Sequence, residues 1–151
     1  MQKQTNSVSE IEISYKPVYI ESIIKNIRTS ADVFAMARDF FDPHLLTIQE
    51  QCVVLFMNRS NRVFGGYKLS TGGINGTVVD TRIILGIALK SLSTGIIIAH
   101  SHPSGNLQPS KADIDLTHNL REAAKLMDIK LIDHLIISTE GYYSFADNAQ
   151  L

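Results

Sequence analysis

The sequence has a single cysteine, Cys52, among its 151 residues. One thiol cannot form a disulfide within the chain, and it excludes a metal site built from several cysteines. It also excludes a zinc-dependent nucleobase deaminase, because that chemistry uses a pair of cysteines together with a His-x-Glu element. The lack of a disulfide framework is typical of proteins in a reducing compartment, so we expect a cytoplasmic location.

The chain also lacks an excess of charge of either sign. It carries 14 lysine and arginine residues against 15 aspartate and glutamate residues, which gives a formal net charge of −1. The basic residues are scattered rather than gathered in a stripe, so the sequence gives no strong case for binding nucleic acid. No apolar run approaches the ~20 residues that a membrane helix needs. The polar N-terminus has no apolar core of the kind that a signal peptide requires.

What the chain does contain fits one globular domain. Hydrophobic residues make up 44% and charged residues 19% of the sequence, values that are typical of soluble proteins with a real core. Residues 1–28 are expected to form a polar N-terminal segment with an edge strand at residues 11–15, and residues 29–151 the domain itself. An edge strand of this kind could pair with a second copy of the chain and form a homo-oligomer.

Strands and helices are predicted to alternate along the domain. Helices are expected at residues 31–41, 81–92 and 110–127, where apolar residues recur at helical spacing after a capping residue. Strands are expected at residues 52–57, 62–69, 77–79, 95–100, 131–138 and 142–145. Some neighbouring strands are joined by turns and others need crossovers, so the order predicts an α/β sandwich with a mixed sheet.

Two histidines and an aspartate gather around the end of the strand predicted at residues 95–100. His100 and His102 stand two positions apart at this strand end, so both imidazoles can point to the same side. Asp113 follows in the first turn of the next helix, where its carboxylate can face the two rings. Two imidazoles and one carboxylate, with a fourth position left for water, are the form of a catalytic zinc site. Zinc lowers the pKa of such a water to about 7.

The same residues also fit a purely structural interpretation. Ser110, followed three residues later by Asp113 and then by an apolar helix, is the pattern of a helix cap with an acid in the first turn. Single histidines are usually structural or lie on the surface. Because three ligands make a short signature, spacing alone leaves both a metal site and a capped helix start open.

Read together, His100, His102, Ser110 and Asp113 match the JAMM metalloprotease motif. The sequence around them, from about Thr29 to Phe145, resembles the bacterial RadC family, whose core is a JAB/MPN domain; the resemblance rests on His102-Pro103-Ser104-Gly105, Pro109-Ser110, Asp113, Thr117 and Asp133-His134-Leu135-Ile136-Ile137. The resemblance implies a three-layer α/β/α fold of the cytidine-deaminase-like type with a mixed sheet. It also implies a zinc ion, Zn²⁺, held by His100, His102 and Asp113.

Two catalytic residues follow from the same resemblance. Glu50, just ahead of the strand predicted at residues 52–57, matches the family's glutamate that activates the zinc water. Ser110 matches the residue that stabilises the tetrahedral oxyanion, and it can cap the helix at the same time. Together these residues predict a JAMM-type zinc hydrolase that cleaves a peptide or isopeptide amide bond of a peptide or protein substrate.

The chain departs from the RadC pattern in two ways. RadC proteins usually have asparagine between the two histidines, where this chain has Ser101, as many JAMM proteases do. They also usually begin with a helix-hairpin-helix DNA-binding segment, for which we expect no room here, so the family's label of DNA repair carries less weight. A non-catalytic JAB/MPN scaffold and a role in DNA repair or recombination are the alternative functions. The complete ligand set argues against the first, and the net charge of −1 argues against the second.

Other histidines and acids in the sequence are predicted to be structural. His134 lies in the strand predicted at residues 131–138 and is expected to be a satisfied core histidine or to support a ligand. Asp133 beside it is expected to bind nearby backbone. His118 is expected to face solvent, and Cys52 is expected to lie in the core.

Overall fold

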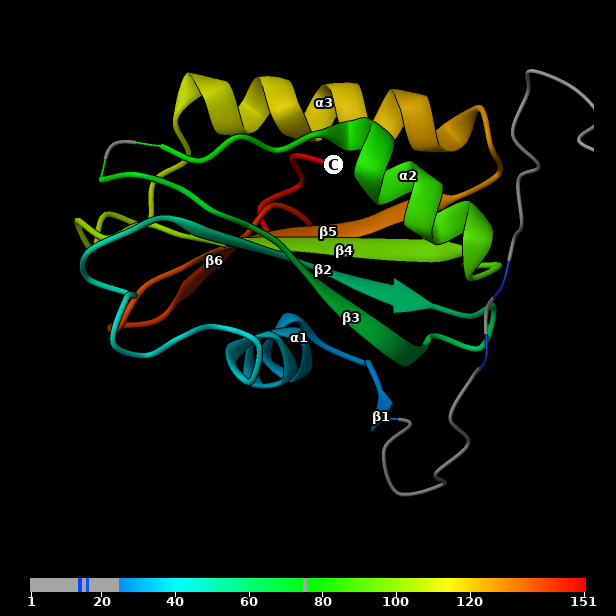
Figure 1. Cartoon of the computed structure of the whole chain (residues 1–151), viewed down its shortest axis with the longest axis horizontal. Coiled ribbons are helices and arrows are strands. Elements are labelled where there is room, and N and C mark those ends of the chain that lie inside the picture. Colours follow the sequence, from blue (N-terminus) through cyan, green and yellow to red (C-terminus); the bar gives the residue numbers. More distant parts are fainter. Residues whose placement is uncertain (1–13, 15, 17–24, 75) are drawn as a thin grey trace, which may run out of the picture.

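A central sheet with helices on both faces forms the body of the molecule. The computed structural model describes residues 14, 16, 25–74 and 76–151. Within them lies a six-stranded sheet with the strand order β1-β3-β2-β4-β5-β6 (Figure 1). Apart from Ser14, the edge strand predicted at residues 11–15 lies outside the described residues, and so do residues 1–10.

The elements alternate along the chain much as predicted. The helices are α1 (Ser30–Arg38), α2 (Thr81–Lys90) and α3 (Lys111–Lys125); the strands are β1 (Lys25–Asn26), β2 (Gln51–Met57), β3 (Arg62–Thr71), β4 (Gly95–Ser101), β5 (Lys130–Ile137) and β6 (Tyr142–Ser144). Strands β4 and β5 are parallel, with α3 as the crossover between them, and the other described strand pairs are antiparallel. The predicted mixed sheet is therefore confirmed.

The sheet is buried on both faces because α1 covers one side and α2 and α3 cover the other (Figure 1). Every residue of β2 and of β4 is buried. Along β2, Val53 and Leu55 pack into the core beneath α1, whereas Cys52 and Val54 pack into the core beneath α2 and α3. Two covered faces explain why these strands are continuously apolar rather than alternating. The three-layer α/β/α prediction is confirmed, and Cys52 is a core residue.

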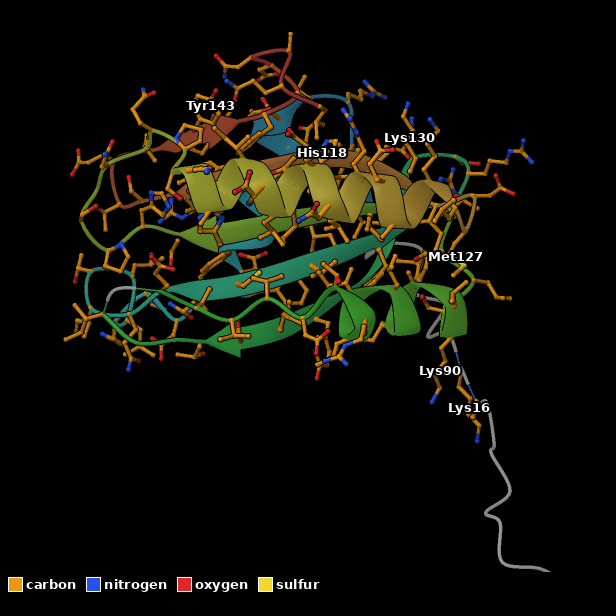
Figure 2. All side chains as sticks on the ribbon, turned by 90° about the horizontal axis from the view of Figure 1, so that it is seen from above. Lys16, Lys90, His118, Met127, Lys130 and Tyr143 are labelled. Carbon is orange, nitrogen blue, oxygen red and sulfur yellow. The ribbon has the colours of Figure 1, made fainter. Side chains whose placement is uncertain are left out.

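The helices begin where capping side chains allow them to. Thr29 caps α1, Asp80 caps α2 and Ser110 caps α3, each by accepting a hydrogen bond from a backbone amide of the first turn. Figure 2 shows α2 and α3 over the same face of the sheet, with strands visible between them and with His118 on α3. The residues of α3 that are buried recur at helical spacing, and they are Asp113, Thr117, Leu120 and Ala124. This face turns Asp113 and Thr117 toward the sheet.

One predicted strand is wrong. Residues 77–79 form no strand, and they belong to a loop that runs from β3 to α2. Val78 is 84% exposed, so it has no neighbouring strand to pack against. The loop is instead tied to the chain before β2, because the Gly72 amide donates to the Glu50 carbonyl at 2.7 Å. Smaller differences lie at the element ends: α1 stops at Arg38 rather than at residue 41, and α3 starts one residue after its cap.

Among the helices of the described residues, none combines the length and the apolar character that a membrane span requires.

Candidate metal centre

The three predicted metal ligands meet at one point beside the end of β4. His100 is the last residue but one of β4, His102 follows the strand directly, and Asp113 lies in the first turn of α3. The two Nε2 atoms of His100 and His102 are 2.9 Å apart. The Asp113 carboxylate lies 3.0 Å from the His100 Nε2 atom and 3.4 Å from the His102 Nε2 atom. The structure thus brings together side chains that the sequence separates by thirteen positions, counted from His100 to Asp113.

The spacing and the chemistry of this donor set fit a zinc ion. Ligand atoms that are each 2.0–2.1 Å from a tetrahedral zinc ion lie about 3.3 Å from one another. The two histidine nitrogens are 2.9 Å apart, and the nearest carboxylate oxygens of Asp113 are 3.0 Å (Oδ1 to His100) and 3.4 Å (Oδ2 to His102) away. With one donor atom taken from each residue, all three atoms lie within 4.8 Å of one another, a spread that a small movement of the carboxylate closes around a zinc ion. The far nitrogen of His102, Nδ1, lies 2.6 Å from the Asn106 carbonyl oxygen, which can only accept, so Nδ1 carries the hydrogen of the neutral ring. The His102 Nε2 atom is then free to bind a cation.

Asp113 is held in its charged form by its neighbours. Burial alone would raise the pKa of this carboxyl, but hydrogen bonds that His100 and His102 donate when their rings are protonated, in the absence of a metal ion, outweigh burial and hold the pKa well below its ordinary value. In return, the hydrogen bond with Asp113 raises the pKa of His102, against the lowering effect of burial, and the Asn106 carbonyl adds to the increase. The site therefore presents a negative charge next to two imidazoles, which suits a divalent cation.

Ser110 and Asp113 also form the capping box that the structural interpretation predicted. The Ser110 hydroxyl and the Ser110 amide both donate to the Oδ2 atom of Asp113 at 2.7 Å, and the Asp113 amide donates back to the hydroxyl at 3.2 Å. The Oδ1 atom of the same carboxylate faces His100. One carboxylate thus caps the helix and faces the histidines, so the two interpretations of the sequence hold together. Because the hydroxyl hydrogen points at Asp113, a role for Ser110 at an oxyanion requires the hydroxyl to rotate.

The three residues open into a cleft of about 700 Å³. One wall comes from the loop between β3 and α2 and includes Ile74, Thr77 and Val79, and the other comes from residues 103–109. Glu50 also lines the cleft, and its negative charge contributes to the raised pKa of His102. Its carboxylate makes no hydrogen bond with the described residues. The predicted base therefore lies on the same cleft as the three ligands, although its catalytic role stays a prediction.

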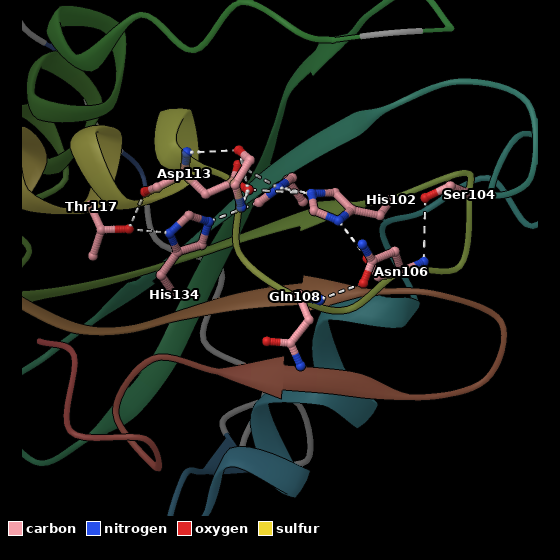
Figure 3. A network of polar contacts seen from close by, with 9 residues as sticks. His102, Ser104, Asn106, Gln108, Asp113, Thr117 and His134 are labelled. Carbon is pink, nitrogen blue, oxygen red and sulfur yellow. Dashed lines mark hydrogen bonds and ion pairs between the residues drawn. The ribbon is translucent and has the colours of Figure 1, made fainter.

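The sequence patterns assign no individual role to two residues that contact the ligands. Thr117 lies one helical turn beyond Asp113, and its hydroxyl donates to the Asp113 carbonyl at 2.6 Å (Figure 3). Asn106 holds His102 through its main-chain carbonyl. The signal for Thr117 is its place on the buried face of α3, four positions from Asp113; the contact of Asn106 uses only backbone and leaves no trace in the residue type. His134 is fully buried behind His100, and His118 is exposed, as predicted.

Comparison with known proteins places this chain in a family. The model of the RadC-like JAB domain matches residues 27–150. A UPF0758 protein of Flavobacterium johnsoniae is 42% identical over 126 residues, which are 82% of this chain and 53% of that protein. One from Porphyromonas gingivalis is 42% identical over 118 residues, 77% of this chain and 52% of the relative. One from Aquifex aeolicus is 34% identical over 126 residues, 83% of this chain and 53% of the relative. The chain spans about half the length of these curated relatives.

Proposed function

Because this chain belongs to the RadC-like JAB domain family and draws two imidazoles and a carboxylate together, we propose that it is a zinc-dependent hydrolase of the JAMM type. Its substrate would be the amide bond of a peptide or of an isopeptide conjugate. The observation that carries the proposal is that one donor atom from each of His100, His102 and Asp113 lies within 4.8 Å of the other two, on a cleft that Glu50 also lines.

In this proposal three residues bind the metal ion, and the walls of the cleft bind the substrate. His100, His102 and Asp113 would hold the metal, and a zinc ion there supplies a Lewis acid that lowers the pKa of a water molecule and polarises a carbonyl. The cleft of about 700 Å³ is within the size range of small-molecule sites, so it can enclose a short stretch of peptide around the bond to be cut. Its walls come from loops, which orient the substrate.

Glu50 moves the proton in this proposal. Its carboxylate takes a proton from the attacking water as the water oxygen bonds to the amide carbon. The protonated Glu50 then gives this proton to the amide nitrogen as the C–N bond breaks, so the products are a carboxylic acid, which keeps the second proton of the water until it ionises, and an amine. Two backbone hydrogen bonds fix the main chain of Glu50 against the neighbouring loop, at 2.7 Å to Gly72 and 3.2 Å to Gly73. A fixed backbone supports a fixed position for the base.

Ser110 is the proposed donor to the oxyanion. Its hydroxyl lies next to the metal ligands because it caps the helix that carries Asp113. Rotation of the hydroxyl away from Asp113 would direct its hydrogen to the negative oxygen that forms when water attacks the carbonyl. The helix start stays capped during this rotation, because the Ser110 amide still donates to Asp113.

The experiment compares the wild-type protein with Glu50→Gln for zinc content and for hydrolysis of linear peptides and lysine isopeptides. We expect about one zinc ion per chain in both proteins and a rate for Glu50→Gln that is lower by about 10²–10⁴-fold, because only the general base is lost. Glu122→Gln is the matched control, since it removes the same charge from the exposed side of α3 and should leave the rate unchanged.

Two results would contradict the proposal. A zinc-loaded protein that cleaves none of the amides, and whose behaviour Glu50→Gln does not alter, would favour a non-catalytic scaffold. Failure of the wild-type protein to bind zinc would contradict the assignment of His100, His102 and Asp113 as a metal centre. Binding of DNA that weakens steeply with added salt would instead favour a nucleic-acid role.

A further inference from the structure

A buried histidine stands behind the metal centre and touches one of its ligands. His134 is 0% exposed, and its Nε2 atom lies 2.8 Å from the Nδ1 atom of His100. Its other ring nitrogen, Nδ1, lies 2.6 Å from the Thr117 hydroxyl oxygen. Figure 3 shows His134 beside Thr117, with Asp113 above both of them. A chain of contacts thus runs from the backbone of α3 through β5 to the ligand on β4.

The number of hydrogens on each group determines which atom donates and which accepts in this series of contacts. The Thr117 hydroxyl has one hydrogen, and the Asp113 carbonyl oxygen at 2.6 Å can only accept it. The Thr117 oxygen must therefore accept from its other neighbour, the Nδ1 atom of His134. His134 carries its hydrogen on Nδ1 as a result.

The position of the hydrogen on His134 then determines the position of the hydrogen on the candidate metal ligand His100. Within the described part of the chain no carboxylate hydrogen-bonds to the buried His134 ring, and the neutral ring has a single N–H hydrogen to place. With a hydrogen on Nδ1, its Nε2 atom carries a lone pair and accepts a hydrogen from the Nδ1 atom of His100. A neutral His100 with a hydrogen on Nδ1 has a bare Nε2 atom, and that atom faces His102 and Asp113.

Both metal-ligating histidines therefore have their far nitrogens on acceptors. For His102 the acceptor is the backbone carbonyl of Asn106, which no substitution of that side chain removes. For His100 the acceptor depends on two side chains. We propose that His134 and Thr117 are positioning residues that fix His100 with its hydrogen on Nδ1 and so keep its Nε2 atom free for a metal ion. This proposal rests on the metal site of the proposed function, but it does not need the site to hydrolyse anything.

The packing of the His134 ring is separate from its hydrogen bonds. The ring stacks on Phe145, with ring centroids 4.7 Å apart and an interplanar angle of 6°. Among the described residues, the Thr117 side chain hydrogen-bonds to the Asp113 carbonyl and to His134, and not to the ring of His100 or of His102. A substitution at Thr117 therefore tests the hydrogen-bond direction without removing a ligand or the stacked ring.

The test compares Thr117→Val, which keeps the shape but removes the hydroxyl, with Thr117→Ser, which keeps the hydroxyl. Long-range proton–nitrogen correlation spectra at alkaline pH report which ring nitrogen of each histidine carries the hydrogen. In the wild type we expect the hydrogen on Nδ1 of both His134 and His100. In Thr117→Val we expect it to move to the Nε2 atom of both rings, because His134 loses its acceptor and becomes a donor to His100.

Zinc affinity, measured by competition with a chelator, is the second measurement. We expect Thr117→Val to bind zinc about 10–100-fold more weakly, as is usual when a partner behind a ligand is lost, and Thr117→Ser to bind like the wild type. A hydrogen on the Nε2 atom of His134 in the wild type would overturn the proposal even if Thr117→Val fails to fold. So would a folded Thr117→Val protein with unchanged spectra and affinity. Neither the spectra nor the zinc affinity depends on catalysis, so the positioning role of His134 and Thr117 can be supported even if the hydrolase proposal fails.

Discussion

Asp133 offers the sharpest test of how the structure supports the buried end of β5. Asp133 is 4% exposed. Its carboxylate accepts three hydrogen bonds, from the His134 amide at 2.7 Å, the Ala146 amide at 3.0 Å and the Ser144 hydroxyl at 2.7 Å. It thus joins β5 to β6 and to the turn that follows. Burial raises the pKa of this carboxyl, and the hydrogen bonds from Ser144 and Ala146 oppose that effect.

The cost of Asp133→Ala follows from the donors that it leaves behind. The Ser144 hydroxyl can rotate toward another acceptor, but the two amides are fixed by the backbone. A buried donor without an acceptor costs about 1–3 kcal/mol, which applies to the amide of the fully buried His134; Ala146 is exposed, so its amide can bind water instead and adds less. Because folded domains are stable by about 5–15 kcal/mol, a loss of about 1–3 kcal/mol is a substantial part of the free energy of unfolding.

Asp133→Asn is the matched control for this prediction. Its amide oxygen can still accept from both backbone amides, and its NH₂ group can donate to Ser144, whose hydroxyl then acts as acceptor. Urea denaturation of both variants measures the free energy of unfolding, and we expect Asp133→Asn to lie within about 1 kcal/mol of the wild type, the size of one net hydrogen bond. An Asp133→Ala protein as stable as Asp133→Asn would refute the reasoning, because the orphaned amides would then cost nothing.

Two further predictions concern titratable groups. The raised pKa of His102 means that its pairing with Asp113 stabilises the metal-free fold fully below the ordinary histidine pKa of about 6.5, and this contribution is lost as pH rises through the raised value. The stability difference between metal-free wild type and Asp113→Asn should shrink over that range in urea titrations; a difference that grows would contradict the pairing. Burial raises the pKa of the Cys52 thiol to about 12, so a thiol reagent at mildly alkaline pH should label it only after unfolding, and rapid labelling of the folded protein would show that Cys52 is accessible.

Much of the fold could be predicted because each local signal agrees with the final packing. The apolar runs of β2 and β4 reflect burial on two faces, and the caps Thr29 and Ser110 mark helix starts to within a residue. The strand prediction for residues 77–79 was wrong because β-branched residues favour strands only where a partner strand exists. Strand β1 was not predicted, since its two residues take their conformation from pairing with β3 rather than from a pattern of their own.

In the candidate site, too, some contacts could be predicted from the sequence and others could not. The proximity of His100, His102 and Asp113 could be predicted because strand and helix geometry fix where neighbouring side chains point. The contact between His134 and Thr117 could not, because it depends on how α3 packs over β5, which no short-range spacing reveals. The contact of His102 with the Asn106 carbonyl is equally hidden, since any residue at that position has a carbonyl.

The metal-facing residues and the walls of the cleft belong to different kinds of segment. His100 and Asp113 are anchored in a central strand and a capped helix, whereas Ile74, which is 75% exposed, and Val79 come from a loop outside the sheet. Substitutions in this loop can therefore change the entrance of the cleft without disturbing the strand and the helix that hold the candidate ligands. Under the proposed hydrolase function, exchanging this loop for the corresponding loop of a relative should change which amide substrates the protein accepts.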